Sequence, residues 1–121
     1  MRIFKSKWFT RFAIKSCIDD SVLKSAVAEI EAGNFDANLG GFVYKQRVAR
    51  KGQGKRGGYR TIVLFKRGER AFFVYGFAKS KQDNITEDEL AWYKEAAKRC
   101  LFGDKNQLDE WLEKAAFNEI L

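Results

Sequence analysis

The sequence contains no histidine and only two cysteines, Cys17 and Cys100, which are too far apart to form a CxxC motif. Zinc and iron sites in proteins are built mainly from these two residue types, so we expect no protein-bound metal. We interpret both cysteines as reduced thiols of an intracellular protein.

Long apolar runs are also missing. No segment approaches the roughly 20 apolar residues of a membrane-spanning helix, and the first residues, MRIFKSKWF, lack the apolar region of a signal peptide. We therefore expect a cytoplasmic protein with no membrane partner. With 121 residues, 45% of them hydrophobic, the chain is predicted to form a single domain over residues 1–121.

Acidic residues are absent from one central stretch, Tyr44–Arg67. This stretch carries nine basic residues: Lys45, Arg47, Arg50, Lys51, Lys55, Arg56, Arg60, Lys66 and Arg67. Four glycines between Gly52 and Gly58 leave the backbone free to bend around a ligand. The region from Tyr44 to Lys81 has a net charge of +11, whereas the whole chain has +7. Such a patch suits a polyanion as partner. Nucleic acid is favoured over a membrane surface because no basic amphipathic helix is present. The alternative is that these charges form a solvated surface that binds no ligand.

The glycines of this stretch match GxGxxG at Gly52–Gly57, but the context does not fit a nucleotide site. A dinucleotide site needs a helix at this point, and the following residues, Tyr59–Phe65, have the character of a strand. A Walker loop is excluded because Gly57 is followed by Gly-Tyr, and a kinase loop because the chain is short and lacks HRD and DFG. We therefore expect no cofactor.

Hydrophobic periodicity predicts an α+β fold in which helices pack on one antiparallel sheet. The expected elements, in chain order, are a short strand at Arg2–Phe4, a helix at Lys7–Ser16, a helix from Asp19–Ser21 to Gly33, a turn-rich segment at Asn34–Gly41, strands at Phe42–Val48, Tyr59–Phe65 and Arg70–Ala78, a helix opened by a capping box at Thr86 and Glu89, and a helix at Asp104–Ala116. The three central strands form a meander, with a loop at Arg50–Gly58. Residues 104–121 are expected to be a helical C-terminal extension.

The meander is expected to bring cations together at one end of the sheet. Lys55, Arg56 and Arg60 then approach Lys79 and Lys81, which follow the neighbouring strand. Cations that repel one another are rarely gathered without an anionic ligand. Phe77, next to Lys79, is predicted to stack on a base, whereas Tyr59 and Tyr75 are more typical of a core.

The stretch KGQGKRGGYRTIVLFKRGERAFFVYGFAKSKQDNI, at Lys51–Ile85, resembles the RelE/HigB-type toxins of bacterial type II toxin–antitoxin systems, within the RelE/ParE superfamily. The likeness covers roughly residues 1–101. It implies a RelE-like fold and a ribosome-dependent mRNA endoribonuclease, or mRNA interferase, that inhibits translation without a metal. The implied partners are mRNA, the ribosome and a cognate antitoxin, often a DNA-binding protein. A ParE-like gyrase poison and a non-catalytic RNA-binding protein are the alternatives.

The resemblance also suggests roles for single residues. Arg60, in the triplet Gly58-Tyr59-Arg60, matches an arginine that meets the scissile phosphate, and Lys79 matches a basic residue at the end of the last strand. With no histidine available, a lysine is the candidate base, and neighbouring cations favour its neutral form. The prediction therefore assigns catalysis to Lys55, Arg60 and Lys79, and substrate binding to Arg47, Lys51, Arg56, Phe77 and Lys81.

The acidic helices from Thr86 onward offer a second surface. Trp111 lies there on an apolar stripe, which either packs on its own domain or docks a partner.

Overall fold

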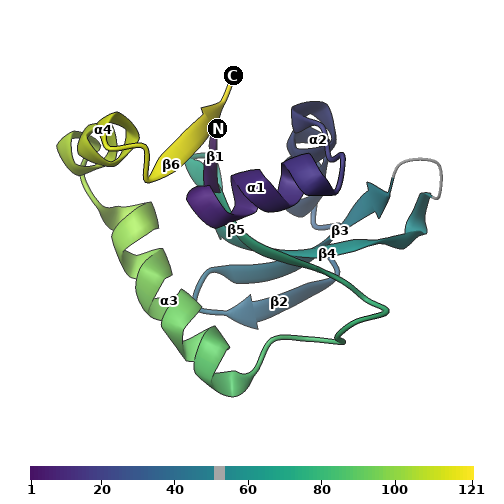
Figure 1. The fold of residues 1–121 in the computed structure, drawn as a ribbon. Helices are drawn as coiled ribbons and strands as arrows, with labels where there is room; N and C mark the ends of the chain where they lie inside the picture. The colour runs from purple at the N-terminus through teal and green to yellow at the C-terminus, as the bar shows by residue number, and fades with distance from the viewer. Residues whose placement is uncertain (51–53) are drawn as a thin grey trace.

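The computed structural model describes residues 1–50 and 54–121, and for residues 50 and 54–57 it describes the backbone without the side chains. Within this part of the chain, six strands form one sheet in the order β2-β3-β4-β5-β1-β6 (Figure 1). The strands are β1 (Arg2–Ser6), β2 (Ala37–Gly40), β3 (Val43–Arg50), β4 (Gly54–Lys66), β5 (Arg70–Ala78) and β6 (Phe117–Ile120).

The helices of the described chain cover both faces of this sheet (Figure 1). They are α1 (Lys7–Lys15), α2 (Asp20–Glu31), α3 (Glu87–Phe102) and α4 (Lys105–Glu113). The first two pack on one face, where Phe9 and Leu23 meet Val63 and Phe73. The last two pack on the other face. None of these helices is long and apolar enough to cross a membrane.

Strand β4 explains why the sheet can be covered on both sides. Ile62 and Leu64 belong to the core under α3 and α4, whereas Val63 and Phe65 belong to the core under α1 and α2. All four side chains are buried. The near-continuous apolar run of this segment is therefore required, because successive side chains of a strand point to opposite faces.

The structure confirms the predicted α+β fold and several of its details. The meander β3-β4-β5 is antiparallel, and β5 has the predicted bounds. The capping box at the start of α3 is present: Glu89 N donates to Thr86 Oγ1 at 3.1 Å, and Thr86 N donates to Glu89 Oε1 at 2.8 Å. Cys17 and Cys100 are both free thiols, as expected.

Three details of the sheet differ from the prediction. β1 pairs in parallel with β5, so the sheet is mixed and not purely antiparallel. β2 forms within the segment expected to be turn-rich, because Ala37 and Asn38 pair with the edge of β3. Most of the loop expected at Arg50–Gly58 belongs to strands, since β3 ends at Arg50 and β4 begins at Gly54, with an irregularity between Val48 and Arg50 that shifts the register; residues 51–53 lie outside the described residues.

The C-terminus is helical only as far as Glu113, which corrects the expected helical extension. Ala115 has φ +58°, Ala116 N donates to Trp111 O, and Ala115 N donates to Leu112 O. These bonds form a Schellman ending with alanine at the position where glycine is usual. The chain then turns back as β6 and pairs antiparallel with the free edge of β1.

Candidate active site

The candidate site lies at the end of the sheet where β4 begins and β5 ends. Arg47 of β3 lies directly opposite Arg60 of β4, which in turn lies opposite Phe77 of β5. Lys79 and Lys81 follow in an exposed turn, closed by a hydrogen bond from Lys81 N to Ala78 O at 2.9 Å. The strand register therefore places Arg47 and Arg60 side by side and sets the two lysines just beyond them.

One carboxylate, that of Asp36, lies among these cations. Arg47 Nε donates to its Oδ1 at 3.3 Å, and Arg60 Nε lies 3.4 Å from its Oδ2. Lys45 Nζ lies 3.7 Å from the same Oδ2. The central stretch itself has no acid, but Asp36, immediately before β2, partly compensates it from outside. Among the described ion pairs, this one carboxylate faces three cations, and Glu29 lines the same hollow as Asp36 and Arg47.

Arg60 is the unusual member of this cluster because it is buried. The residue is only 4% exposed, and its Nη1 atom has no hydrogen-bond partner among the described residues. Leaving a buried donor unpaired costs about 1–3 kcal/mol, more when it is charged, and such donors are rare in folded proteins. A cation-rich site with an unused guanidinium donor is suited to accept an oxygen of an anionic ligand.

A buried amide holds the backbone that carries Asp36. Gln46 accepts from Asp36 N at 3.2 Å through its Oε1, and its Nε2 donates to Ala26 O at 3.2 Å and to Asn34 O at 3.0 Å. Thr61 Oγ1 donates to Gln46 O at 3.0 Å. The loop after α2 is thereby fixed to β3 and β4, and Asp36 is fixed beside Arg60. Sequence reasoning missed both Asp36 and Gln46, since an aspartate in a turn-rich segment gives no signal of this contact.

The other predicted site residues are only partly accounted for. Lys51 lies outside the described residues, and so do the side chains of Lys55 and Arg56, whose backbone belongs to β4. Phe77 is 4% exposed and packs in the core under α3, so its ring is not presented for stacking on a base. Its side chain points to the face of the sheet that α3 covers, and the stacking role stays a prediction.

A cationic strand end on a small α+β protein is a feature typical of proteins that bind a polyanion. A family model described as the RelE toxin of the RelE/RelB toxin–antitoxin system matches residues 1–120. The chain therefore belongs to the RelE toxin family and is the toxin of a toxin–antitoxin system, as the resemblance indicated. Membership implies an antitoxin as partner and engagement of the ribosome. A comparison with curated proteins found no match.

Proposed function

We propose that this toxin is a ribosome-dependent endoribonuclease that cleaves mRNA without a metal ion. Ribosome-dependent mRNA cleavage is the general activity of the RelE family. The structural observation that carries the proposal is the buried guanidinium of Arg60, which has an unpaired Nη1 donor within a cluster of cations. A phosphodiester is the anion that this site would meet on mRNA.

Cleavage without a metal uses the ribose 2′-hydroxyl next to the scissile bond. Its oxygen attacks the phosphorus, the bond from phosphorus to the 5′-oxygen breaks, and a 2′,3′-cyclic phosphate and a 5′-hydroxyl result. The reaction needs a base for the 2′-hydroxyl proton, an acid for the leaving 5′-oxygen, and cations for the charge on the phosphorane. We assign the base to Lys55 and phosphate contacts to Arg56 and Lys79.

Arg60 is assigned to the charge that develops on the phosphorane. Its Nε lies 3.4 Å from Asp36 Oδ2, and its buried Nη1 has no partner among the described residues, so a phosphate that reaches Nη1 would supply the acceptor that this atom lacks. Preorganised donors of this kind lower the barrier because they need no reorientation during the reaction. The ribosome lowers the barrier further by holding the mRNA in the reactive geometry.

The test is primer extension on mRNA that is being translated in a cell-free system. Cuts at defined positions within codons, which disappear when translation is blocked, are the expected result. Linearised supercoiled DNA in the presence of gyrase, with intact mRNA, would instead indicate a ParE-like poison. RNA binding with neither product would indicate a non-catalytic binding protein.

A pair of substitutions separates charge from chemistry. Arg60→Lys keeps the positive charge but loses the planar fork, so single-turnover cleavage should fall by ~10²–10³ while ribosome binding changes much less. The control is Lys66→Ala at the other end of β4, where Lys66 pairs with Glu69 at 2.7 Å. This control should cost a little affinity and hardly any rate. Near-normal cleavage by Arg60→Lys, or its loss in Lys66→Ala, would place the active site at the other end of the strand.

A further inference from the structure

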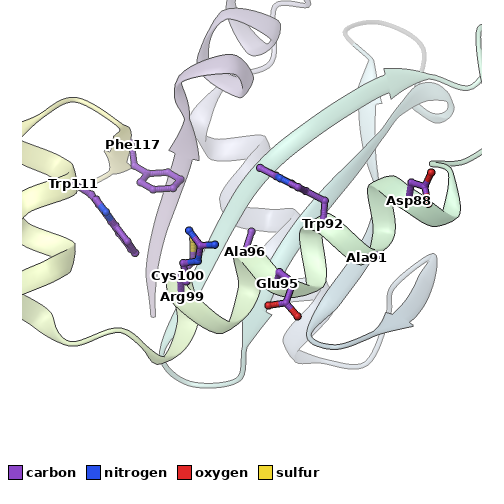
Figure 2. A pocket seen from close by; sticks show the side chains of 9 residues that line it. All are labelled: Asp88, Ala91, Trp92, Glu95, Ala96, Arg99, Cys100, Trp111 and Phe117. Carbon is purple, nitrogen blue, oxygen red and sulfur yellow. The ribbon is translucent and has the colours of Figure 1, made fainter.

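Two surface hollows of this protein differ in their chemistry. The hollow beside α3, of about 610 Å³, is lined by aromatic rings together with Asp88, Glu95 and Arg99 (Figure 2). No residue that lines it, within the described chain, belongs to the cation cluster around Arg60. A second hollow, of about 410 Å³, adjoins that cluster directly. Its lining residues are Glu29, Asn34, Phe35, Asp36, Gln46 and Arg47.

The carboxylate of Asp36 links this second hollow to the cations of the candidate active site. Its Oδ1 accepts from Arg47 Nε at 3.3 Å, and its Oδ2 lies 3.4 Å from Arg60 Nε and 3.7 Å from Lys45 Nζ. The side chain of Arg47 is 49% exposed, whereas that of Arg60 is only 5% exposed. Because water screens the exposed pair more strongly, Asp36 acts mainly on Arg60. The guanidinium of Arg60 thus has an anionic partner at Nε and, among the described residues, none at Nη1.

The buried amide of Gln46 determines where this carboxylate lies. Its Oε1 accepts from the backbone N–H groups of Asp36 and Arg47 at 3.2 and 3.1 Å. Its Nε2 donates to the carbonyl oxygens of Ala26 and Asn34 at 3.2 and 3.0 Å. A shift of this side chain would leave buried polar groups unpaired, which is costly. One side chain therefore fixes the backbone that carries Asp36 to α2 and to β3.

A carboxylate at this place has two opposing effects on an RNA phosphate. It repels the phosphate, and two unit charges about 7 Å apart in water change an affinity by about threefold. Glu29, which lines the same hollow, adds to the negative charge there. Asp36 therefore favours the reaction only if it improves the geometry of a group that meets the developing charge. A guanidinium that is oriented before the reaction provides such a gain, because it needs no reorientation in the transition state.

We propose that Asp36 and Gln46 are positioning residues for the cleavage reaction. Gln46 places Asp36, and Asp36 orients the guanidinium of Arg60 toward the scissile phosphate. The inference rests on the proposed nuclease function and extends it to two residues that act only through Arg60. In this arrangement Asp36 lowers the affinity for RNA slightly and raises the rate of the chemical step.

The experiment is single-turnover cleavage on ribosomes loaded with mRNA, at a series of toxin concentrations, so that the maximal rate and the half-saturating concentration are both obtained. Asp36→Asn keeps the size of the side chain and removes its charge. The maximal rate should fall by about 10- to 100-fold, since the guanidinium loses its orientation. The half-saturating concentration should fall by about threefold at low salt, since a repulsive charge has gone. A merely structural role would not improve the affinity.

A second variant changes the geometry without changing the charge. Gln46→Met keeps the carboxylate of Asp36 but removes the hydrogen bonds that place it. The maximal rate should fall to a similar degree, with a half-saturating concentration within about twofold of the original. The matched control is Glu69→Gln, which removes one negative charge from the pair with Lys66 at the other end of β4. This control should change neither quantity by more than about twofold. All rates are expressed per folded molecule, with the folded fraction taken from near-ultraviolet circular dichroism.

Arg60→Met separates positioning from direct participation in the chemistry. If Asp36 acts only through Arg60, adding Asp36→Asn to a chain that already carries Arg60→Met should lower the rate by less than about twofold. Losses that multiply would mean that Asp36 contacts the reacting atoms itself, and would overturn the proposal. A readout without cleavage is the NMR order parameter of the Arg60 Nε–H bond, which should fall in both Asp36→Asn and Gln46→Met.

The remaining outcomes are distinguishable from a failure of the proposed function. Unchanged maximal rates in Asp36→Asn and Gln46→Met, or unchanged order parameters, would overturn the positioning inference alone. A gain in both affinity and rate in Asp36→Asn would also overturn it, because Asp36 would then only compete with the phosphate for Arg60. If the unchanged protein cleaves no mRNA on the ribosome, the proposed function fails and the positioning inference fails with it.

Discussion

Replacing Asp36 by Asn should destabilise the protein far more than loss of an ordinary surface ion pair. The substitution keeps the size of the side chain and removes its charge. Three cations then face one another without a counter-ion, and Arg60 becomes a buried cation whose only charged partner among the described residues has gone. We expect the loss of stability to come mainly from Arg60. Arg47 is half-exposed, so water replaces part of its lost interaction with Asp36.

The magnitude follows from burial and distance. Two unit charges 4 Å apart interact by about 4 kcal/mol at an effective dielectric constant of about 20, and removing one partner of a fully buried pair costs about 3–5 kcal/mol. Asp36 is not fully buried, since its side chain is 15% exposed. Its contacts, at 3.3–3.7 Å, are also longer than the best charged hydrogen bonds. We therefore expect a loss of about 2–3 kcal/mol in the free energy of unfolding.

The assay is equilibrium unfolding in urea, with Glu69→Gln as the matched control. Glu69 pairs with Lys66 at 2.7 Å on the surface, and this pair should contribute less than about 1 kcal/mol. The double variant Asp36→Asn with Arg60→Met should cost less than the sum of the two single changes, because removing both partners leaves no uncompensated charge. Equal losses in Asp36→Asn and Glu69→Gln, or strict additivity in the double variant, would refute the reasoning.

Three further predictions concern other parts of the molecule. Glu119 of β6 receives two hydrogen bonds of 2.8 Å from Arg2, which lower its pKa below the ordinary value of 4.5. The contribution of Glu119 to stability is therefore present above pH 4.5 and is lost as the pH falls through the lowered pKa. Unfolding measured against pH should show less acid sensitivity in Glu119→Gln than in the unchanged protein. An added Cβ at Gly76 would lie 2.4 Å from the ring of Phe12, so Gly76→Ala should cost about 1–3 kcal/mol in thermal unfolding, and an unchanged midpoint would contradict the contact. Ribosome or RNA affinity should fall steeply with salt, and a flat response would exclude the cationic end of the sheet as the binding surface.

The elements that sequence reasoning predicted well carry their own local signals. β5 is rich in aromatic residues, and α3 opens with a capping box, so both were predicted at the observed places. Gly33 likewise ends α2 with the backbone conformation for which glycine is suited, at φ +85°. In each case the residues that decide the structure are neighbours along the chain.

The elements that were missed depend on partners distant in sequence. β6 has only four residues and forms because β1 leaves an edge free, with Ile3 opposite Ile120. The turn that precedes it places Ala115 at φ +58°, where no glycine announces the end of the helix. The parallel pairing of β1 with β5 also could not be read locally, since it depends on the path of the whole chain between them.

The candidate site also combines features that the local sequence predicts with features that depend on residues distant along the chain. The sequence identified the cations, but the burial of Arg60 and its pairing with Asp36 depend on how the loop before β2 packs against β3. A buried arginine with one carboxylate at 3.4 Å and an unpaired Nη1 is often a less stable arrangement than a well-packed apolar side chain. An anion that occupies the site would offset this cost, because a ligand that binds only the folded state stabilises it. The proposed mRNA phosphate would supply the acceptor that Nη1 of Arg60 lacks.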